Sequence, residues 1–93
     1  MKSASVKPGY RIIVEWIRPH SSVLDLGCGN GELLSTLVKE KHVHGQGIEI
    51  DKNVIFECVA QGLSVFQQDI DTGLSEYADE FFDYIILITF IRL

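Results

Sequence analysis

The chain has 93 residues, so its length limits it to one domain or part of one. Hydrophobic residues make up 46% of the chain, which argues against intrinsic disorder, and the formal net charge is −5 with no basic cluster. This acidic balance disfavours binding of nucleic acid through a charged face, and the longest apolar run, Tyr84 to Phe90, is too short to cross a membrane. The N-terminus has no signal-peptide pattern, and Cys28 and Cys58 lack a CxxC spacing, so we expect a cytoplasmic protein with free thiols.

Helical and extended patterns alternate along the sequence after a flexible lead-in at residues 1–9. The predicted helices span residues 10–18, 31–41 and 52–61, and the predicted strands span 22–26, 45–50, 64–67 and 82–89. Residues 69–78 are interpreted as a polar connection. This order predicts an α/β fold, namely a Rossmann-like parallel sheet of about four strands with flanking helices.

Single residues refine these elements. Asp51 is a plausible N-cap for the helix that follows it, and Gly62 is a stop signal at the end of that helix. Trp16 is expected to anchor the core. His42 and His44 are expected in an exposed turn, and the three histidines have no metal-ligand spacing with the cysteines, so no metal site is predicted.

The fourth predicted strand is unusual because its residues 84–88 are all apolar. Such a run belongs in the middle of a sheet, where both faces are covered. One interpretation is a small complete domain; the preferred one is the truncated front half of a larger domain. An uncovered apolar edge at this strand also predicts self-association through it.

The most informative segment is the pattern Asp25-x-Gly27-x-Gly29-x-Gly31, between an apolar strand and the start of a helix. Glycines let a ligand approach the backbone, and a helix N-terminus favours negative or polar groups. The dinucleotide fingerprint requires glycines at positions 1, 3 and 6, but the sixth position is Glu32 or Leu34. A dinucleotide-binding loop is therefore disfavoured, and a purely structural turn remains an alternative.

This pattern, with Glu49 at the end of the second strand, resembles the class I S-adenosylmethionine-dependent methyltransferases. The resemblance implies that Gly27, Gly29 and Gly31 line the cofactor S-adenosylmethionine. It implies that Asp25 supports the loop or the cofactor amine and that Glu49 accepts both ribose hydroxyls. The chemistry is consistent, because one carboxylate can accept two hydroxyl donors and because open α/β sheets bind ligands at the carboxyl ends of their strands.

The same resemblance implies further cofactor contacts. Asp69 matches the position that contacts the adenine amino group, and Ile70 matches the position that packs on the ring. Ile50 is included in the site beside Glu49, and Cys28 is expected to be a small filler near the cofactor, since no base is visible that would make it a nucleophile.

Four segments narrow the resemblance to the MetW family of methionine biosynthesis proteins: residues 23–34, 47–51, 68–74 and 82–87. The match covers about residues 10–88. It implies a partial S-adenosylmethionine-binding domain over 10–93, a methyltransferase-like function associated with methionine biosynthesis, and homoserine O-acetyltransferase as a partner. No catalytic residue or methyl acceptor is identified.

Other interpretations stay open at this point. Glu49 could be a solvated acid at a strand end, Asp69 a loop acid or a helix cap, and Asp83 a residue that bonds to neighbouring backbone. At the level of function, the alternative is a non-catalytic, truncated module that binds the cofactor or a partner and self-associates. A dehydrogenase is disfavoured by the glycine spacing.

Overall fold

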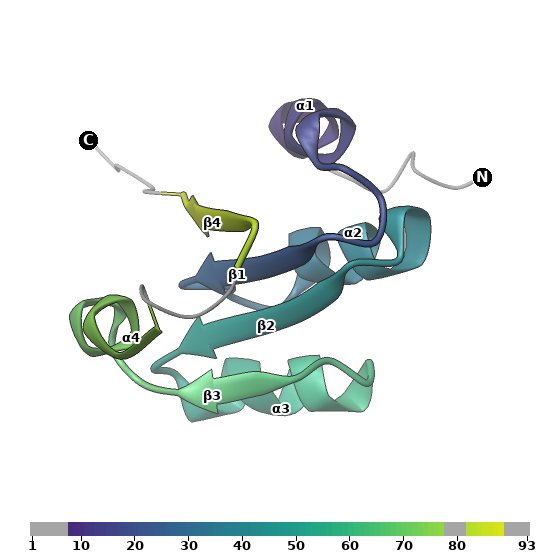
Figure 1. The fold of residues 1–93 in the computed structure, drawn as a ribbon. Coiled ribbons are helices and arrows are strands. Elements are labelled where there is room, and N and C mark those ends of the chain that lie inside the picture. Colours follow the sequence, from purple (N-terminus) through teal and green to yellow (C-terminus); the bar gives the residue numbers. More distant parts are fainter. Residues whose placement is uncertain (1–7, 78–81, 89–93) are drawn as a thin grey trace.

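Four parallel strands form the centre of the computed structural model, which describes residues 8–77 and 82–88 (Figure 1). The helices are α1 (Pro8–Trp16), α2 (Glu32–Lys41), α3 (Lys52–Ala60) and α4 (Ile70–Tyr77). The strands are β1 (Ser22–Leu26), β2 (His44–Glu49), β3 (Val65–Gln67) and β4 (Tyr84–Leu87). Their order in the sheet is β3-β2-β1-β4, which confirms the predicted Rossmann-like α/β class. Residues 1–7 of the expected lead-in lie outside the described residues.

The strand register places the two functional strand ends side by side. In the parallel ladder between β1 and β2, Asp25 is opposite Gly47 and Leu26 is opposite Ile48. Glu49 is therefore one residue beyond the point where β1 turns into the glycine loop. This alignment follows from the parallel connection through α2, which returns the chain to the same edge of the sheet.

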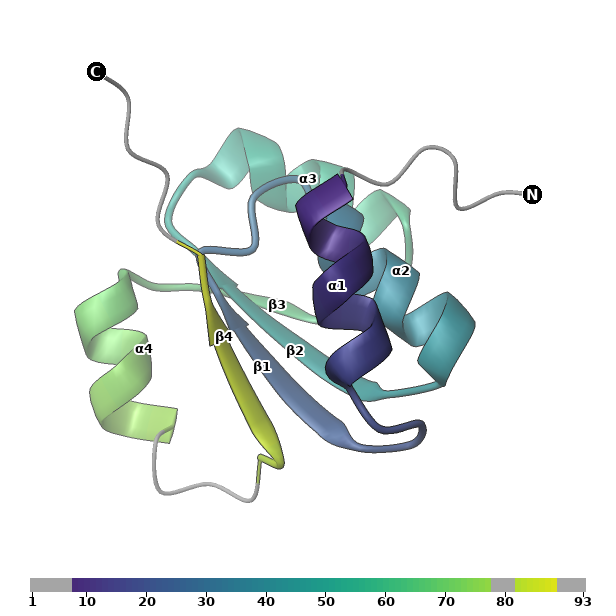
Figure 2. The same cartoon turned by 90° about the horizontal axis from the view of Figure 1, so that it is seen from above.

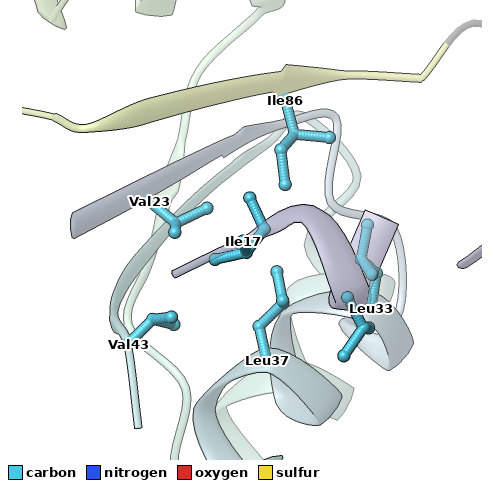
Figure 3. Close-up of a cluster of buried hydrophobic side chains, with 7 residues drawn as sticks. Ile17, Val23, Leu33, Leu37, Val43 and Ile86 are labelled. Atoms are coloured by element: carbon cyan, nitrogen blue, oxygen red, sulfur yellow. The ribbon is translucent and has the colours of Figure 1, made fainter. Parts of the chain in front are cut away.

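Helices cover both faces of the sheet. Figure 2 shows α1, α2 and α3 on one face and α4 on the other. The largest apolar cluster lies beneath α1 and α2 and joins Ile17, Val23, Leu33, Leu37, Val43 and Ile86 (Figure 3). On the α4 side, Leu24, Leu26 and Ile48 form a second cluster against Tyr77. Side chains of β1 therefore pack into clusters on both faces of the sheet, Val23 into the first and Leu24 and Leu26 into the second.

Specific hydrogen bonds and a left-handed glycine stabilise the ends of α3 and α2. The Asp51 carboxylate accepts a hydrogen bond from the Asn53 N–H at 2.9 Å, which confirms the predicted N-cap of α3. Gly62 follows α3 with a φ of 81°, a conformation that favours glycine. At the end of α2, the Lys41 ammonium donates to the Ile17 carbonyl at 2.9 Å and joins this helix to α1.

Three predictions from the sequence are wrong. His44 is the first residue of β2 and does not lie in the turn after α2. The segment interpreted as a polar connection contains α4, which lies against β1 and β2 through Gly73; a Cβ there would lie 3.0 Å from Ile48 Cγ2. Trp16 is not a core anchor, because 74% of it is exposed. Val14 on α1 and Ile17 directly after it are buried instead, and Trp16 and Ile12 are exposed.

β4 is shorter than predicted and begins two residues later. The Ser22 N–H donates to the Asp83 carboxylate at 2.8 Å, and the Asp83 N–H donates to the Ser22 carbonyl, which confirms that Asp83 bonds to neighbouring backbone. Ile86 is buried, whereas Ile85 and Leu87 on the other face are 42% and 52% exposed. Within the described residues, no helix is long and apolar enough to cross a membrane.

Candidate functional site

The glycine loop passes from the end of β1 over the end of β2. The N–H groups of Gly27 and Cys28 both donate to the Ile48 carbonyl, at 2.7 and 3.0 Å. Gly27, Gly29 and Gly31 have φ values of 74°, 58° and 83°, a region that is costly for other residues. The alternating glycines therefore allow a tight, repeatedly left-handed turn that ends on the first residue of α2.

The three glycines differ in their surroundings. A Cβ on Gly31 would lie 2.5 Å from Leu63 Cδ1 and 3.1 Å from Cys58 Sγ, so this glycine permits close packing beneath the loop. A Cβ on Gly29 would meet nothing within 4 Å. Gly27 is exposed, and a Cβ there would lie 3.3 Å from Ile70 Cδ1. The open side of the loop is thus at Gly27 and Gly29.

The Glu49 carboxylate holds this loop in place. Its Oε1 accepts from the Gly29 N–H at 2.9 Å, and its Oε2 accepts from the N–H groups of Ile50 and Asp51 at 3.1 Å each. Oε1 keeps one further acceptor position, whereas both lone pairs of Oε2 are occupied. The side chain is therefore fixed by backbone donors and can still accept a hydrogen bond from a ligand at Oε1. It is not a free solvated acid at a strand end.

Asp25 lies beneath the loop and is only 3% exposed. Burial raises its pKa from 3.8 to about 7, and the negative charge of Glu49 adds to the shift. Two neighbouring carboxyls in one site, one of them removed from water, favour a ligand with positive charge or with hydrogen-bond donors.

A cleft of about 300 Å³ opens beside Glu49 at the carboxyl ends of the strands. It brings together five residues predicted from the sequence: Gly27, Glu49, Ile50, Asp69 and Ile70. Asp25, Cys28, Gly29 and Gly31 are not among its lining residues. The volume and the mixture of apolar side chains with carboxylates are typical of a site for a small polar organic ligand.

Asp69 has a structural role at the edge of the cleft. Its carboxylate accepts from the Thr72 N–H at 2.7 Å and from the Thr72 hydroxyl at 3.1 Å, so it caps α4. These hydrogen bonds lower the pKa of Asp69. Of the alternatives for Asp69, the cap is observed, and the carboxylate remains exposed to the cleft.

Two lining residues were absent from the predicted site, Gln68 and Asp71. The Gln68 side chain donates to the Glu76 carboxylate at 3.0 Å, and its Oε1 is buried without a hydrogen-bond partner among the described residues. Gln68 precedes Asp69 and Asp71 follows Ile70 in the chain, and this proximity to two predicted site residues was the available sequence signal.

The two cysteines are free and buried on the far side of the loop. Cys58 Sγ donates to the Gly29 carbonyl at 3.1 Å, and Cys28 Sγ lies 3.7 Å from the same oxygen. Burial raises the pKa of both thiols, which agrees with Cys28 as a packed filler and not a nucleophile. Within the described part of the chain, no cluster of three or more His, Cys, Asp or Glu side chains is arranged to hold a metal ion.

Two of the solved structures to which this fold is similar are S-adenosylmethionine-dependent methyltransferases. One from Archaeoglobus fulgidus has a TM-score of 0.73 and 28% identity, over 90% of this chain and 37% of that one. One from Thiobacillus denitrificans, in complex with S-adenosyl-L-homocysteine, has a TM-score of 0.64 and 20% identity, over 89% of this chain and 39% of that one. The chain thus spans well under half the length of these methyltransferases.

The sequence is also similar to a curated protein of Rhodopirellula baltica, the bifunctional methionine biosynthesis protein MetXA/MetW. The two are 36% identical over 83 residues, which cover 81% of this chain and 13% of that protein. Residues 7–92 match the family model described as methionine biosynthesis protein MetW. The chain belongs to the MetW family.

Proposed function

We propose that this chain binds S-adenosylmethionine in the cleft beside Glu49 and supplies the donor-binding part of a MetW-type methyltransferase associated with methionine biosynthesis. The observation that carries the proposal is the Glu49 carboxylate, fixed by three backbone N–H groups at the mouth of a left-handed glycine loop. Oε1, which holds one backbone donor, can accept a ribose hydroxyl in this position, and a second hydroxyl would share Oε2 with its two backbone donors.

The rest of the cleft suits the other parts of such a ligand. Ile50 and Ile70 are 60% and 39% exposed and can pack against the faces of a purine. The exposed Asp69 carboxylate can accept from an exocyclic amino group while it caps α4. Gly27 and Gly29 leave the loop open for the methionine part, and Asp25 beneath it complements positive charge.

In methyl transfer from a sulfonium donor, the bound cofactor supplies the activated methyl group. The contribution of these residues is to hold and orient the donor, which lowers the entropic cost of an in-line displacement. The methyl acceptor is unassigned. The chain spans 37% of the Archaeoglobus fulgidus methyltransferase structure, and the proposal assigns to it only the binding of the donor.

A partner of the homoserine O-acetyltransferase type is part of this proposal. It is supported by the Rhodopirellula baltica relative, whose name gives MetXA and MetW as two functions of one chain. Two such activities on one chain are consistent with association of the separate proteins.

A second candidate function, a non-catalytic module that self-associates, is favoured by β4. This strand is at the end of the described sheet (Figure 1), and Ile85, Leu87 and Ile88 are between 41% and 52% exposed. Apolar side chains on an edge strand favour pairing with another chain. Sedimentation at increasing concentration tests this candidate, which predicts dimers; a monomer at high concentration contradicts it.

Isothermal titration tests the cofactor proposal. We expect S-adenosylmethionine to bind and NAD not to bind. Glu49→Gln should weaken the affinity for S-adenosylmethionine about 10- to 100-fold, because hydrogen bonds to a charged acceptor contribute about 1.5–3 kcal/mol. Glu15→Gln removes a carboxylate from the exposed side of α1 and should leave the affinity unchanged. A folded chain, checked by circular dichroism, that binds neither ligand contradicts the proposal.

A further inference from the structure

The glycine loop has a second anchor in addition to Glu49. The Gly29 N–H donates to the Glu49 carboxylate, whereas the carbonyls of Gly29 and Asn30 accept hydrogen bonds from the end of α3. Cys58 Sγ donates to the Gly29 carbonyl at 3.1 Å, and Gln61 Nε2 donates to the Asn30 carbonyl at 2.8 Å. Two consecutive carbonyls of the loop are therefore held by side chains of one helix end.

The end of α3 fixes the position from which Gln61 reaches the loop. Gln61 is the C-cap of this helix, and its backbone N–H donates to the Cys58 carbonyl at 3.0 Å. Its Nε2 donates to the Glu57 carbonyl at 3.0 Å as well as to the Asn30 carbonyl. Both N–H groups of the side-chain amide are thus used. One closes the end of α3, and the other joins this helix to a loop 31 residues earlier in the chain.

The hydrogen bond between Gln61 and Asn30 joins two exposed residues, whereas Cys58 is fully buried. An exposed hydrogen bond adds little to the packing of the core, so its main effect is to restrict the loop. Glycines give this loop backbone freedom that must be lost when a ligand is bound. A loop that is held before the ligand arrives avoids part of that entropic cost.

We propose that Gln61 is a positioning residue for the cofactor site, which holds the Asn30 carbonyl and thereby keeps the glycine loop in the conformation that the ligand meets. This inference rests on the proposed function, in which S-adenosylmethionine binds beside Glu49. Gln61 is not among the residues that line the cleft, so it acts on the ligand through the loop.

Isothermal titration with S-adenosylmethionine tests this role. Gln61→Met keeps the length of the side chain and removes both of its donors, so the affinity should fall about 2- to 10-fold, as expected for the loss of one net hydrogen bond. Gln61→Arg restores N–H donors and should recover most of the affinity, although its charge disfavours a cationic ligand. Glu57→Gln changes an exposed side chain of the same helix and should leave the affinity unchanged.

Amide hydrogen exchange of the ligand-free chain gives a second measurement. The amides of Gly31 and Glu32 follow the anchored Asn30 carbonyl and are both hydrogen-bonded to acceptors in the loop. They should exchange faster in Gln61→Met and regain their rates in Gln61→Arg. The Ile50 amide, directly after β2, should keep its rate in both variants. If Gln61 only closed the end of α3, stability would fall and the loop amides would not change.

The outcomes separate this inference from the proposed function. If S-adenosylmethionine binds the wild-type chain and Gln61→Met equally well, the positioning role is wrong and the cofactor site stands. A loss of affinity that Gln61→Arg does not recover would also overturn the role, because it would come from the altered helix end. If the folded wild-type chain does not bind the ligand, the proposed function is overturned together with the role of Gln61 in binding, and the exchange rates alone decide whether Gln61 holds the loop.

Discussion

Replacing Gly31 by alanine should destabilise the fold through packing and not through the backbone alone. Gly31 is buried and precedes α2 with a φ of 83°. An added Cβ would lie 2.5 Å from Leu63 Cδ1 and 3.1 Å from Cys58 Sγ. Cys58 is fully buried and Leu63 is 9% exposed, so either side chain must repack among its buried neighbours to make room.

Gly62 provides a matched control. Its φ is 81°, and an added Cβ would meet nothing within 4 Å. A left-handed alanine costs about 1–2 kcal/mol, and the stiffer unfolded chain returns about 0.4–1 kcal/mol, so Gly62→Ala should cost about 1 kcal/mol. Gly31→Ala carries the same backbone cost plus about 1–3 kcal/mol for overpacking, which gives about 2–4 kcal/mol.

Urea unfolding followed by circular dichroism measures both variants against the wild-type chain. We expect a larger fall in the free energy of unfolding for Gly31→Ala than for Gly62→Ala, with similar slopes. Equal losses, within about 0.5 kcal/mol, would refute the reasoning. Such a result would mean that the loop has room for a side chain at residue 31 and that its glycine serves some other purpose.

Three further predictions follow from single residues. The pKa of Asp25, raised by burial from 3.8 to about 7, makes the folded state less stable as the pH rises from about 4 to 7. Between pH 5 and pH 8, the free energy of unfolding of the wild-type chain should therefore fall by up to about 3 kcal/mol, and the Asp25→Asn variant should lack this fall. An equal pH dependence in both chains would contradict it. Glu49→Gln should speed amide hydrogen exchange at Gly29, Ile50 and Asp51, whose N–H groups donate to the Glu49 carboxylate. The amides of Gly27 and Cys28, which donate to the Ile48 carbonyl, should keep their exchange rates. Uniform exchange rates across the loop would show that Glu49 does not hold it. Trp16→Ala should change the free energy of unfolding by no more than about 0.5 kcal/mol, because Trp16 is 74% exposed. Trp16 is the single tryptophan of the chain, so the wild-type fluorescence should be that of a solvated tryptophan. Blue-shifted emission would place Trp16 in a core and contradict this.

The strand, loop and helix around the glycines were predictable because their signals are local. An apolar run, alternating glycines and an amphipathic helix each act within a few residues, and the parallel topology follows from the alternation of strands and helices. The Asp51 cap was predictable for the same reason, since an N-cap bonds to backbone only two residues away.

The features that the sequence did not reveal depend on tertiary contacts. α4 has eight residues and a central glycine, so its propensity is low; it is stabilised by the Asp69 cap and by the close approach of Gly73 to Ile48. Trp16 was misplaced because α1 carries large apolar residues on both sides, and residue type alone does not say which side meets the sheet.

The candidate site likewise combines features that the sequence predicted with features that depend on tertiary contacts. Residue types and spacing identified Glu49 and the glycines, but the hydrogen bond from the Gly29 N–H to the Glu49 carboxylate depends on how the loop crosses β2. The burial of Asp25 likewise follows from the packing around it, because residue type alone does not show whether an acid at a strand end is buried.

Isothermal titration of the folded chain with S-adenosylmethionine tests the central claim most directly. The cleft beside Glu49 predicts saturable binding of one ligand per chain, weakened about 10- to 100-fold in Glu49→Gln and unchanged in Glu15→Gln. The absence of heat of binding from a chain that circular dichroism shows to be folded, or an equal affinity of the Glu49→Gln variant, would contradict it.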